Sequence, residues 1–140
     1  MAEFTNANAV TIAAGQNVPL TESAIAGKPC IVHREGAGIV TLRGMTSQCK
    51  ARYKVSFGAN VALPDGATVA DILVALAING EPLNSATARV TPTAAGDYAN
   101  IFVAAFIEVP RGCCTTVAAE NASTQEIIVA NANLIAERVA

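Results

Sequence analysis

The chain has 140 residues, with nine Lys and Arg residues against eleven Asp and Glu residues, and a formal net charge of −2. Charged residues make up only 14% of it, compared with about 25% in an average soluble domain, and they form no run of like charge. This pattern argues against binding to nucleic acid or to a membrane surface. Because 52% of so weakly charged a chain is hydrophobic, we expect an oligomer that covers apolar surface.

The first residues, MAEFTNANAV, lack the basic segment and apolar run of a secretory signal. The longest apolar stretch, residues 72–78, is far shorter than the roughly 20 residues that a membrane-spanning helix needs. Four cysteines are too few for a disulfide scaffold in a chain of this length. We therefore expect a soluble protein that is made in a cytoplasm.

Strand patterns dominate the first half of the chain. Residues 49–63 alternate between apolar and polar side chains with the period of two that a half-buried strand requires. Gly58 interrupts this pattern and predicts a bulge or a close approach of another segment. Shorter strands are predicted at residues 10–12, 18–20, 30–33 and 39–42.

The second half continues the same pattern. ILVALAI, residues 72–78, is favoured as a buried strand over a helix, because Asn79-Gly80 follows it as a strong hairpin signal. Further strands are predicted at residues 86–91, 98–109, 115–119, 127–129 and 133–139. The spacing indicates an all-β sandwich or barrel of about eight to ten strands. We expect residues 1–9 to be an N-terminal arm and residues 10–140 to form a single domain.

The adjacent Cys113 and Cys114 raise the question of a metal or redox site. A disulfide between them would be strained, because neighbouring Cα atoms lie about 3.8 Å apart, below the usual minimum of about 4.4 Å. Cys30, His33 and Cys49 are a possible set of metal ligands, and Cys30 with Cys49 is a possible disulfide, but no C-x₂₋₄-C zinc pattern occurs. We favour free thiols that fill space as small hydrophobic side chains, with no metal site.

Catalytic patterns are equally weak. The sequence contains no nucleophile elbow, zinc-protease motif, phosphate loop or dinucleotide-binding motif, and its one histidine, His33, lies in a polar turn sequence. Asp65 lacks the alternating acidic partners of a calcium loop, although Asp97 could join it in space. We predict no catalytic residue, no metal site and no cofactor, and therefore a protein that is not an enzyme.

Several strings resemble structural proteins of phages and prophages of gut Firmicutes. They are NIFVAAFIEVPRGCCTTVAAENAS, ANLIAERV, CIVHREGAGIVTLRG and CKARYKVSFGANVALPDG. The order of strands and hairpins also resembles the trimeric jelly-roll heads of the tumour-necrosis-factor and complement type, which small head-fibre, capsid-decoration and fibre-tip modules use. The likeness extends from about Val10 to Val139.

This resemblance implies a jelly-roll β-sandwich that forms a homotrimer and is displayed on a virion. Its partners would be other copies of the chain and the phage capsid protein, and the role would be capsid decoration or head fibre. The alternative is the tip module of a phage fibre that binds a receptor or a host-surface glycan. By the same analogy, the candidate subunit interface comprises Tyr98, Ile101, Phe102, Val103, Phe106, Ile107, Leu134 and Ile135.

Overall fold

The computed structural model describes residues 2–27 and 29–140, and these form eleven β-strands in two antiparallel sheets. The first sheet has the order β3 (Glu22–Ile25), β1 (Ala2–Asn6), β11 (Ile127–Arg138), β6 (Lys50–Ala62) and β9 (Ala99–Pro110), with β2 (Val10–Ile12) also paired to β11. The second has the order β4 (Ile31–His33), β5 (Ile39–Arg43), β10 (Cys114–Asn121), β7 (Ile72–Ile78) and β8 (Glu81–Val90).

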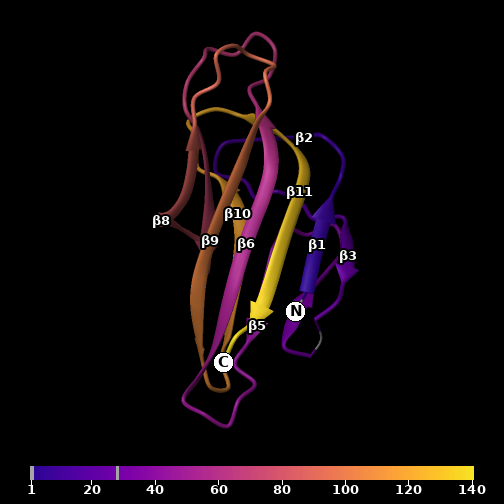
Figure 1. Ribbon diagram of the computed structural model, residues 1–140, viewed down its shortest axis with the longest axis vertical. Helices are drawn as coiled ribbons and strands as arrows, with labels where there is room; N and C mark the ends of the chain where they lie inside the picture. The colour runs from indigo at the N-terminus through magenta and orange to yellow at the C-terminus, as the bar shows by residue number, and fades with distance from the viewer. Residues whose placement is uncertain (1, 28) are drawn as a thin grey trace.

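The chain alternates between the two sheets from β6 onward. β6 lies in the first sheet, the β7–β8 hairpin in the second, β9 in the first, β10 in the second and β11 in the first (Figure 1). No helix long and apolar enough to cross a membrane occurs in the described residues. The all-β jelly-roll prediction is confirmed.

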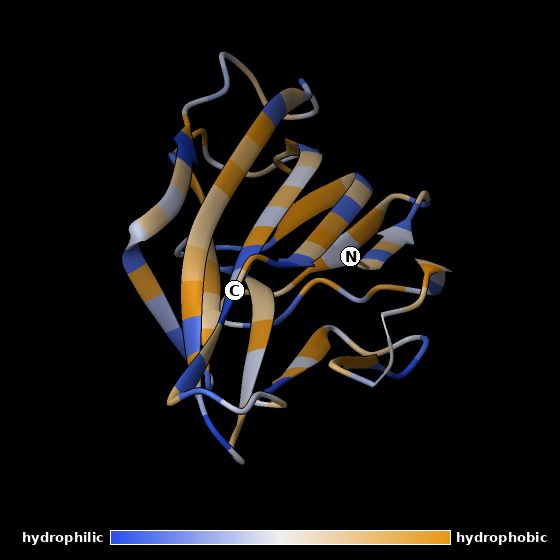
Figure 2. Ribbon diagram, turned by 60° about the horizontal axis from the view of Figure 1, so that its bottom comes forward, coloured by the Kyte–Doolittle hydropathy of each residue, from blue (hydrophilic) through white to orange (hydrophobic). Residues whose placement is uncertain are grey.

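The core lies between the sheets and follows from the period-two pattern. In β6, Ala51, Tyr53, Val55 and Phe57 are buried, whereas the residues between them point outward. Alternating hydrophobic and polar bands run along the long strands in Figure 2. Successive side chains of a strand point to opposite faces, so one face of each sheet enters the core.

The predicted hairpin at Asn79-Gly80 is confirmed. Both residues have positive φ, 53° for Asn79 and 88° for Gly80, and they connect β7 to β8. Asn and Gly tolerate this left-handed conformation better than other residues, which explains the signal in the sequence. The Asn79 side-chain oxygen also accepts a hydrogen bond from the Thr116 backbone N–H of β10, at 3.0 Å.

The expected N-terminal arm is different in the structure. Ala2–Asn6 is a strand, β1, between β3 and β11, and Phe4 on it is buried in the core. The alternation of Ala2, Phe4 and Asn6 on the inner face explains why these residues pair with the sheet. Residues 2–6 therefore belong to the folded domain and do not form a separate arm.

Three other boundaries differ from the sequence-based prediction. Residues 18–20 form no strand, although Val18 donates a backbone hydrogen bond to Ala119 at 2.8 Å and extends the second sheet. The strand Glu22–Ile25 was not predicted, because it is short and three of its residues are exposed. The two predicted strands at 127–129 and 133–139 are one strand, β11, with an irregularity at Asn131, where φ is 55°.

Candidate subunit interface

The outer face of the first sheet carries two exposed aromatic rings. Phe102 and Phe106 on β9 have exposed fractions of 66% and 65%, although both lie in the middle of a regular strand. β9 is the last strand of its sheet, so one of its edges has no pairing partner within that sheet. A long apolar edge strand is a typical site of association with another chain.

The side chains between the two rings are small and uncharged, whereas the exposed Lys54 lies directly opposite Phe106 in register. Register pairs Phe102 with Gly58 and Ala104 with Ser56 on the neighbouring strand β6. We call this surface the β6–β9 face; it consists of Ser56, Gly58, Phe102, Ala104 and Phe106. It is a shallow apolar surface with rings at one side, which suits close packing of a second protein surface.

Polar groups border the β6–β9 face at its upper end. The Asn60 side chain donates a hydrogen bond to the Asn131 side-chain oxygen at 3.1 Å, and Asn100 donates to the Asn60 side-chain oxygen at 3.2 Å. This row of amides crosses three strands, β11, β6 and β9. The amides satisfy one another without a charge, so they can be covered at a modest cost in desolvation.

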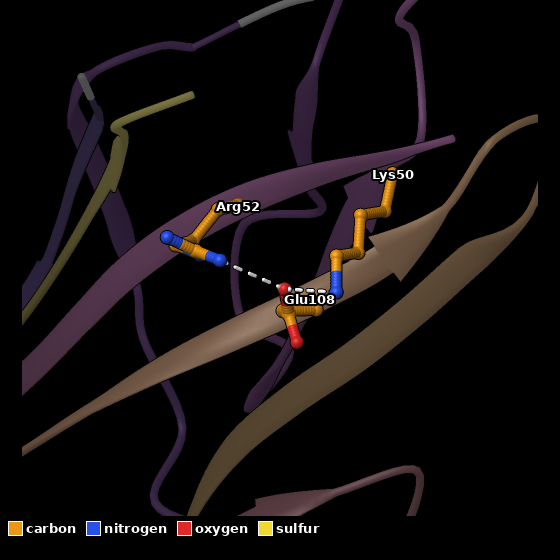
Figure 3. Close-up of polar contacts among 3 residues, drawn as sticks. All are labelled: Lys50, Arg52 and Glu108. Carbon is orange, nitrogen blue, oxygen red and sulfur yellow. Dashed lines mark hydrogen bonds and ion pairs between the residues drawn. The ribbon is translucent and has the colours of Figure 1, made fainter. Parts of the chain in front are cut away.

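Charged groups border the β6–β9 face at its lower end. The Glu108 carboxylate lies 2.7 Å from Lys50 Nζ and 3.1 Å from Arg52 Nη2 (Figure 3). These two cations hold the pKa of Glu108 below its ordinary value. Phe106, Arg52 and Glu108 line a hollow of about 300 Å³ at this border. One carboxylate thus serves two cations, and the border is net positive.

The predicted interface residues divide between the two faces of the strands. Phe102 and Phe106 are exposed on the outer face, and Ile135 is half-buried there, beside Ser56 in register. Four residues point into the core of their own chain: Ile101, Val103, Ile107 and Leu134. These four side chains pack in the core on the inner side of the sheet, so they cannot contact another subunit directly. The interface itself stays a prediction.

Tyr98 lies outside the β6–β9 face. It comes just before β9, has an exposed fraction of 54%, and lines a hollow of about 470 Å³ with the β8–β9 loop. Thr91, Thr93 and Asp97 also line this hollow, and Thr93 donates a hydrogen bond to the Asp97 carboxylate at 3.0 Å. The sequence analysis assigned Tyr98 to the interface because Tyr98 begins the apolar run that continues along β9.

The cysteines are free in the described residues, and three of them are exposed: Cys49, Cys113 and Cys114. The expectation that they fill the core is therefore wrong for these three. Cys113 closes a turn with Pro110, to whose carbonyl its backbone N–H donates at 3.0 Å, and this turn places both neighbouring thiols at the end of the molecule. In the described residues, no group of three or more potential ligands is close enough to hold a metal.

His33 has a structural role within the chain. One ring nitrogen lies 3.0 Å from Ser23 Oγ and the other 2.9 Å from the Ala37 carbonyl oxygen. Its ring also packs against Phe4, with the ring centroids 4.5 Å apart. Since Ser23 and Phe4 belong to the first sheet and His33 to the second, the histidine connects the two sheets at their open side.

Sequence reasoning missed the amide row and the shared carboxylate. Both depend on the register between strands that are far apart in the chain, such as Arg52 opposite Glu108 and Asn60 opposite Asn100. The one sequence feature that pointed to this charged border was the alternation along β6, which predicts that Lys50, Arg52 and Lys54 share its outer face.

The fold resembles two solved structures along nearly the whole chain. The globular domain of a zebrafish complement 1qA protein matches with a TM-score of 0.66 and 10% identity, over 99% of this chain and 96% of that one. Eiger TNF from S. frugiperda matches with a TM-score of 0.70 and 13% identity, over 99% of this chain and 91% of that one. No protein-family model and no curated protein matches. At these identities the likeness is one of fold: the chain is a jelly-roll β-sandwich of the C1q and TNF type.

Proposed function

We propose that the chain is a non-enzymatic structural protein of a bacteriophage particle. It assembles as a homotrimer through the β6–β9 face and serves as a capsid decoration protein or as the head of a head fibre. It is made in the host cytoplasm and resides on the virion. The exposed pair Phe102 and Phe106 on a long edge strand is the observation that carries the proposed assembly.

The energetics favour covering this surface. Burial of one Phe side chain contributes about 1.5–3 kcal/mol, and each protomer presents two such rings. The face is wider than the two rings alone, because small side chains and neutral amides continue it across β6 and β11. The phage setting rests on the resemblance of the quoted strings, and the non-enzymatic role agrees with a fold shared with C1q and TNF domains.

Light scattering on the purified protein tests the assembly. We expect a mass of three chains of 14.3 kDa. Phe102→Asp should give a folded monomer, because its carboxylate lies opposite Gly58 and would be buried in the seam without a cation. The matched control is Ile39→Asp, since Ile39 is 46% exposed but lies on the other sheet, and this variant should remain trimeric. A monomeric wild-type protein would refute the proposal.

Co-sedimentation tests the partner. We expect the trimer to pellet with phage capsids that lack it and to stay in solution without them. Bound protein that appears only with tail fractions would contradict the decoration role.

The hollow beside the β8–β9 loop favours a second candidate, a recognition module for host-surface glycan. An exposed aromatic ring beside a carboxylate and two hydroxyls is a combination that can stack on a sugar and bond its hydroxyls. A glycan array is the test, with Tyr98→Ala as the variant that should lose binding and Ile39→Ala as the control. No binding by the wild-type protein would exclude this role.

A further inference from the structure

Two groups of charged residues of opposite sign lie at opposite ends of the molecule. At the lower end of Figure 1, the loop of residues 44–49 and the turn of residues 110–113 lie together. Arg111 donates a backbone hydrogen bond to Cys49 at 3.0 Å, and Gly44 donates one to Cys113 at 2.8 Å. We call this region the basic end; its cations are Arg43, Lys50, Arg52, Lys54, Arg111 and Arg138, and the carboxylates beside them are Glu108 and Glu137.

The opposite end is acidic. Three loops meet there: residues 63–71, 91–98 and 122–126 (Figure 1). Gly96 donates a backbone hydrogen bond to Leu63 at 2.9 Å, and the Gln125 side chain donates one to the Thr68 carbonyl at 2.8 Å. We call this region the acidic end; its carboxylates are Asp65, Asp71, Asp97 and Glu126.

Few cations compensate the acidic end. Arg89 lies 3.7 Å from the Asp71 carboxylate. Within residues 2–27 and 29–140, no ion pair is formed by Asp65, Asp97 or Glu126. Asp65 lies close to the other acidic loop, because a Cβ on Gly96 would be 3.0 Å from its Oδ1. The carboxylates of two neighbouring loops therefore add to one negative surface.

The two ends are too far apart to neutralise each other within one molecule. β6 spans the distance between them with 13 residues, or about 40 Å at roughly 3.3 Å per residue. At physiological ionic strength, interactions between exposed charges are screened beyond about 8 Å. The formal net charge of −2 thus conceals a strong separation of charge along the molecule.

We propose that copies of this protein stack end to end, with the basic end of one copy on the acidic end of the next. Such a contact joins two different surfaces, and because these lie at opposite ends of the long axis, repeated contacts extend into a filament. The inference holds for single chains and for trimers, and it does not rest on the β6–β9 face. In a trimer with parallel chains, each end would carry three copies of the same charges.

The contact should be sensitive to salt. Exposed ion pairs contribute only about 0–1 kcal/mol each, so several must act together, and added salt weakens all of them. Complementary potentials would also select the head-to-tail orientation, because contacts between like ends repel. A glycan held in the hollow at the acidic end would compete with the contact.

Charge reversal at each end is the decisive experiment. The basic-end variant carries Arg43→Glu and Arg111→Glu, and the acidic-end variant carries Asp65→Lys and Glu126→Lys. All four side chains are exposed, so both variants should fold, which circular dichroism checks. Sedimentation velocity then follows self-association of full-length protein at about 20 mM and about 500 mM salt.

We expect the wild-type protein to form larger species with rising concentration at low salt and to lose them at high salt. Each variant alone should associate at least about tenfold more weakly than the wild-type protein. An equimolar mixture of the two variants should recover pairwise association, because the unchanged acidic end of the basic-end variant can still contact the unchanged basic end of the acidic-end variant. A chain with all four substitutions should associate more weakly than the wild-type protein, because both of its ends lose their net charge.

Three outcomes would overturn the proposal: no salt-dependent association of the wild-type protein, association of both variants at wild-type strength, or loss without recovery in the mixture. The result is distinguishable from failure of the proposed trimer. Phe102→Asp should remove the trimer, and it lies opposite Gly58, away from both charged ends, so this variant should still stack at low salt.

Discussion

The ring of Phe102 lies over Gly58, its direct partner on the neighbouring strand. A Cβ at Gly58 would come 3.8 Å from Phe102 Cδ2 and 3.7 Å from the Ile101 carbonyl oxygen. An aromatic side chain opposite a glycine covers backbone that would otherwise be open to water. These are ordinary contact distances, so the close approach that the sequence predicted at Gly58 is not found. The ring opposite Gly58 is one of the two that we place in the subunit seam.

Substitutions at Gly58 should separate folding from assembly. Gly58→Ala places its methyl group at ordinary contact distance, and Ala costs a strand about 0.5–1 kcal/mol less than Gly, so the melting temperature should stay equal or rise. Gly58→Leu should also fold, but its side chain would fill the β6–β9 face and weaken association. Thermal unfolding and light scattering measure the two effects; a Leu variant with wild-type association would place the seam elsewhere.

Tyr53 should make stability depend on alkaline pH. Its hydroxyl is buried and donates a hydrogen bond to the Arg43 carbonyl at 2.6 Å, and burial raises its pKa above the ordinary value of 10.0. The neutral phenol therefore stabilises the fold fully below about pH 10, and this contribution is lost as the pH rises through the folded-state pKa. Tyr53→Phe should cost about 1–2 kcal/mol at pH 8.

The difference between the wild-type protein and Tyr53→Phe should shrink as the pH rises above 10. Urea unfolding at pH 8 and about pH 11 measures it, because all other titrating groups are the same in both proteins. The difference in tyrosinate absorbance between the wild-type protein and Tyr53→Phe reports ionisation of this phenol, because the contribution of Tyr98 is the same in both. An equal difference at both pH values would show that the hydroxyl does not titrate with folding.

Gly44 should be the glycine least tolerant of substitution. A Cβ there would lie 2.1 Å from the Pro110 carbonyl oxygen, which is a backbone atom in the β9–β10 turn. Gly44 also donates to Cys113 and accepts from Gly112, so it cannot move away without the loss of two hydrogen bonds. Gly44→Ala should destabilise the protein by about 2–4 kcal/mol, measured by chemical unfolding. Gly58→Ala is the matched control, and equal stabilities would contradict the packing at Gly44.

The sequence predicted most of the fold because each long strand carries a complete pattern. Residues 50–61 alternate between outward and buried positions, and Asn79-Gly80 adopts the turn conformation that its residue types favour. Short strands with exposed side chains, such as Glu22–Ile25, leave no such pattern. The N-terminal strand was misjudged because only Phe4 among its residues is a large hydrophobic side chain.

The site was predicted only where it follows from the alternation along one strand. Phe102 and Phe106 lie on one face and Ile101, Val103 and Ile107 on the other, as the period of two requires. Which face enters the core depends on the opposite sheet, so the sequence did not distinguish core residues from surface residues. The separation of charge between the two ends depends on which loops meet, and strand topology alone determines that.

The thiols should react as surface groups. Cys49, Cys113 and Cys114 are exposed, whereas Cys30 is half-buried, with Arg138 Nη1 3.5 Å from its sulfur. In reduced native protein, a thiol reagent such as dithionitrobenzoate should therefore modify three cysteines fast and Cys30 more slowly. Cys113→Ser and Cys114→Ser should each change stability by less than about 0.5 kcal/mol, because neither side chain packs in the core. If all four cysteines react at equal rates before and after guanidinium unfolding, Cys30 is not protected in the fold. If Cys113→Ser or Cys114→Ser lowers the free energy of unfolding by more than about 1 kcal/mol, that thiol is packed in the interior.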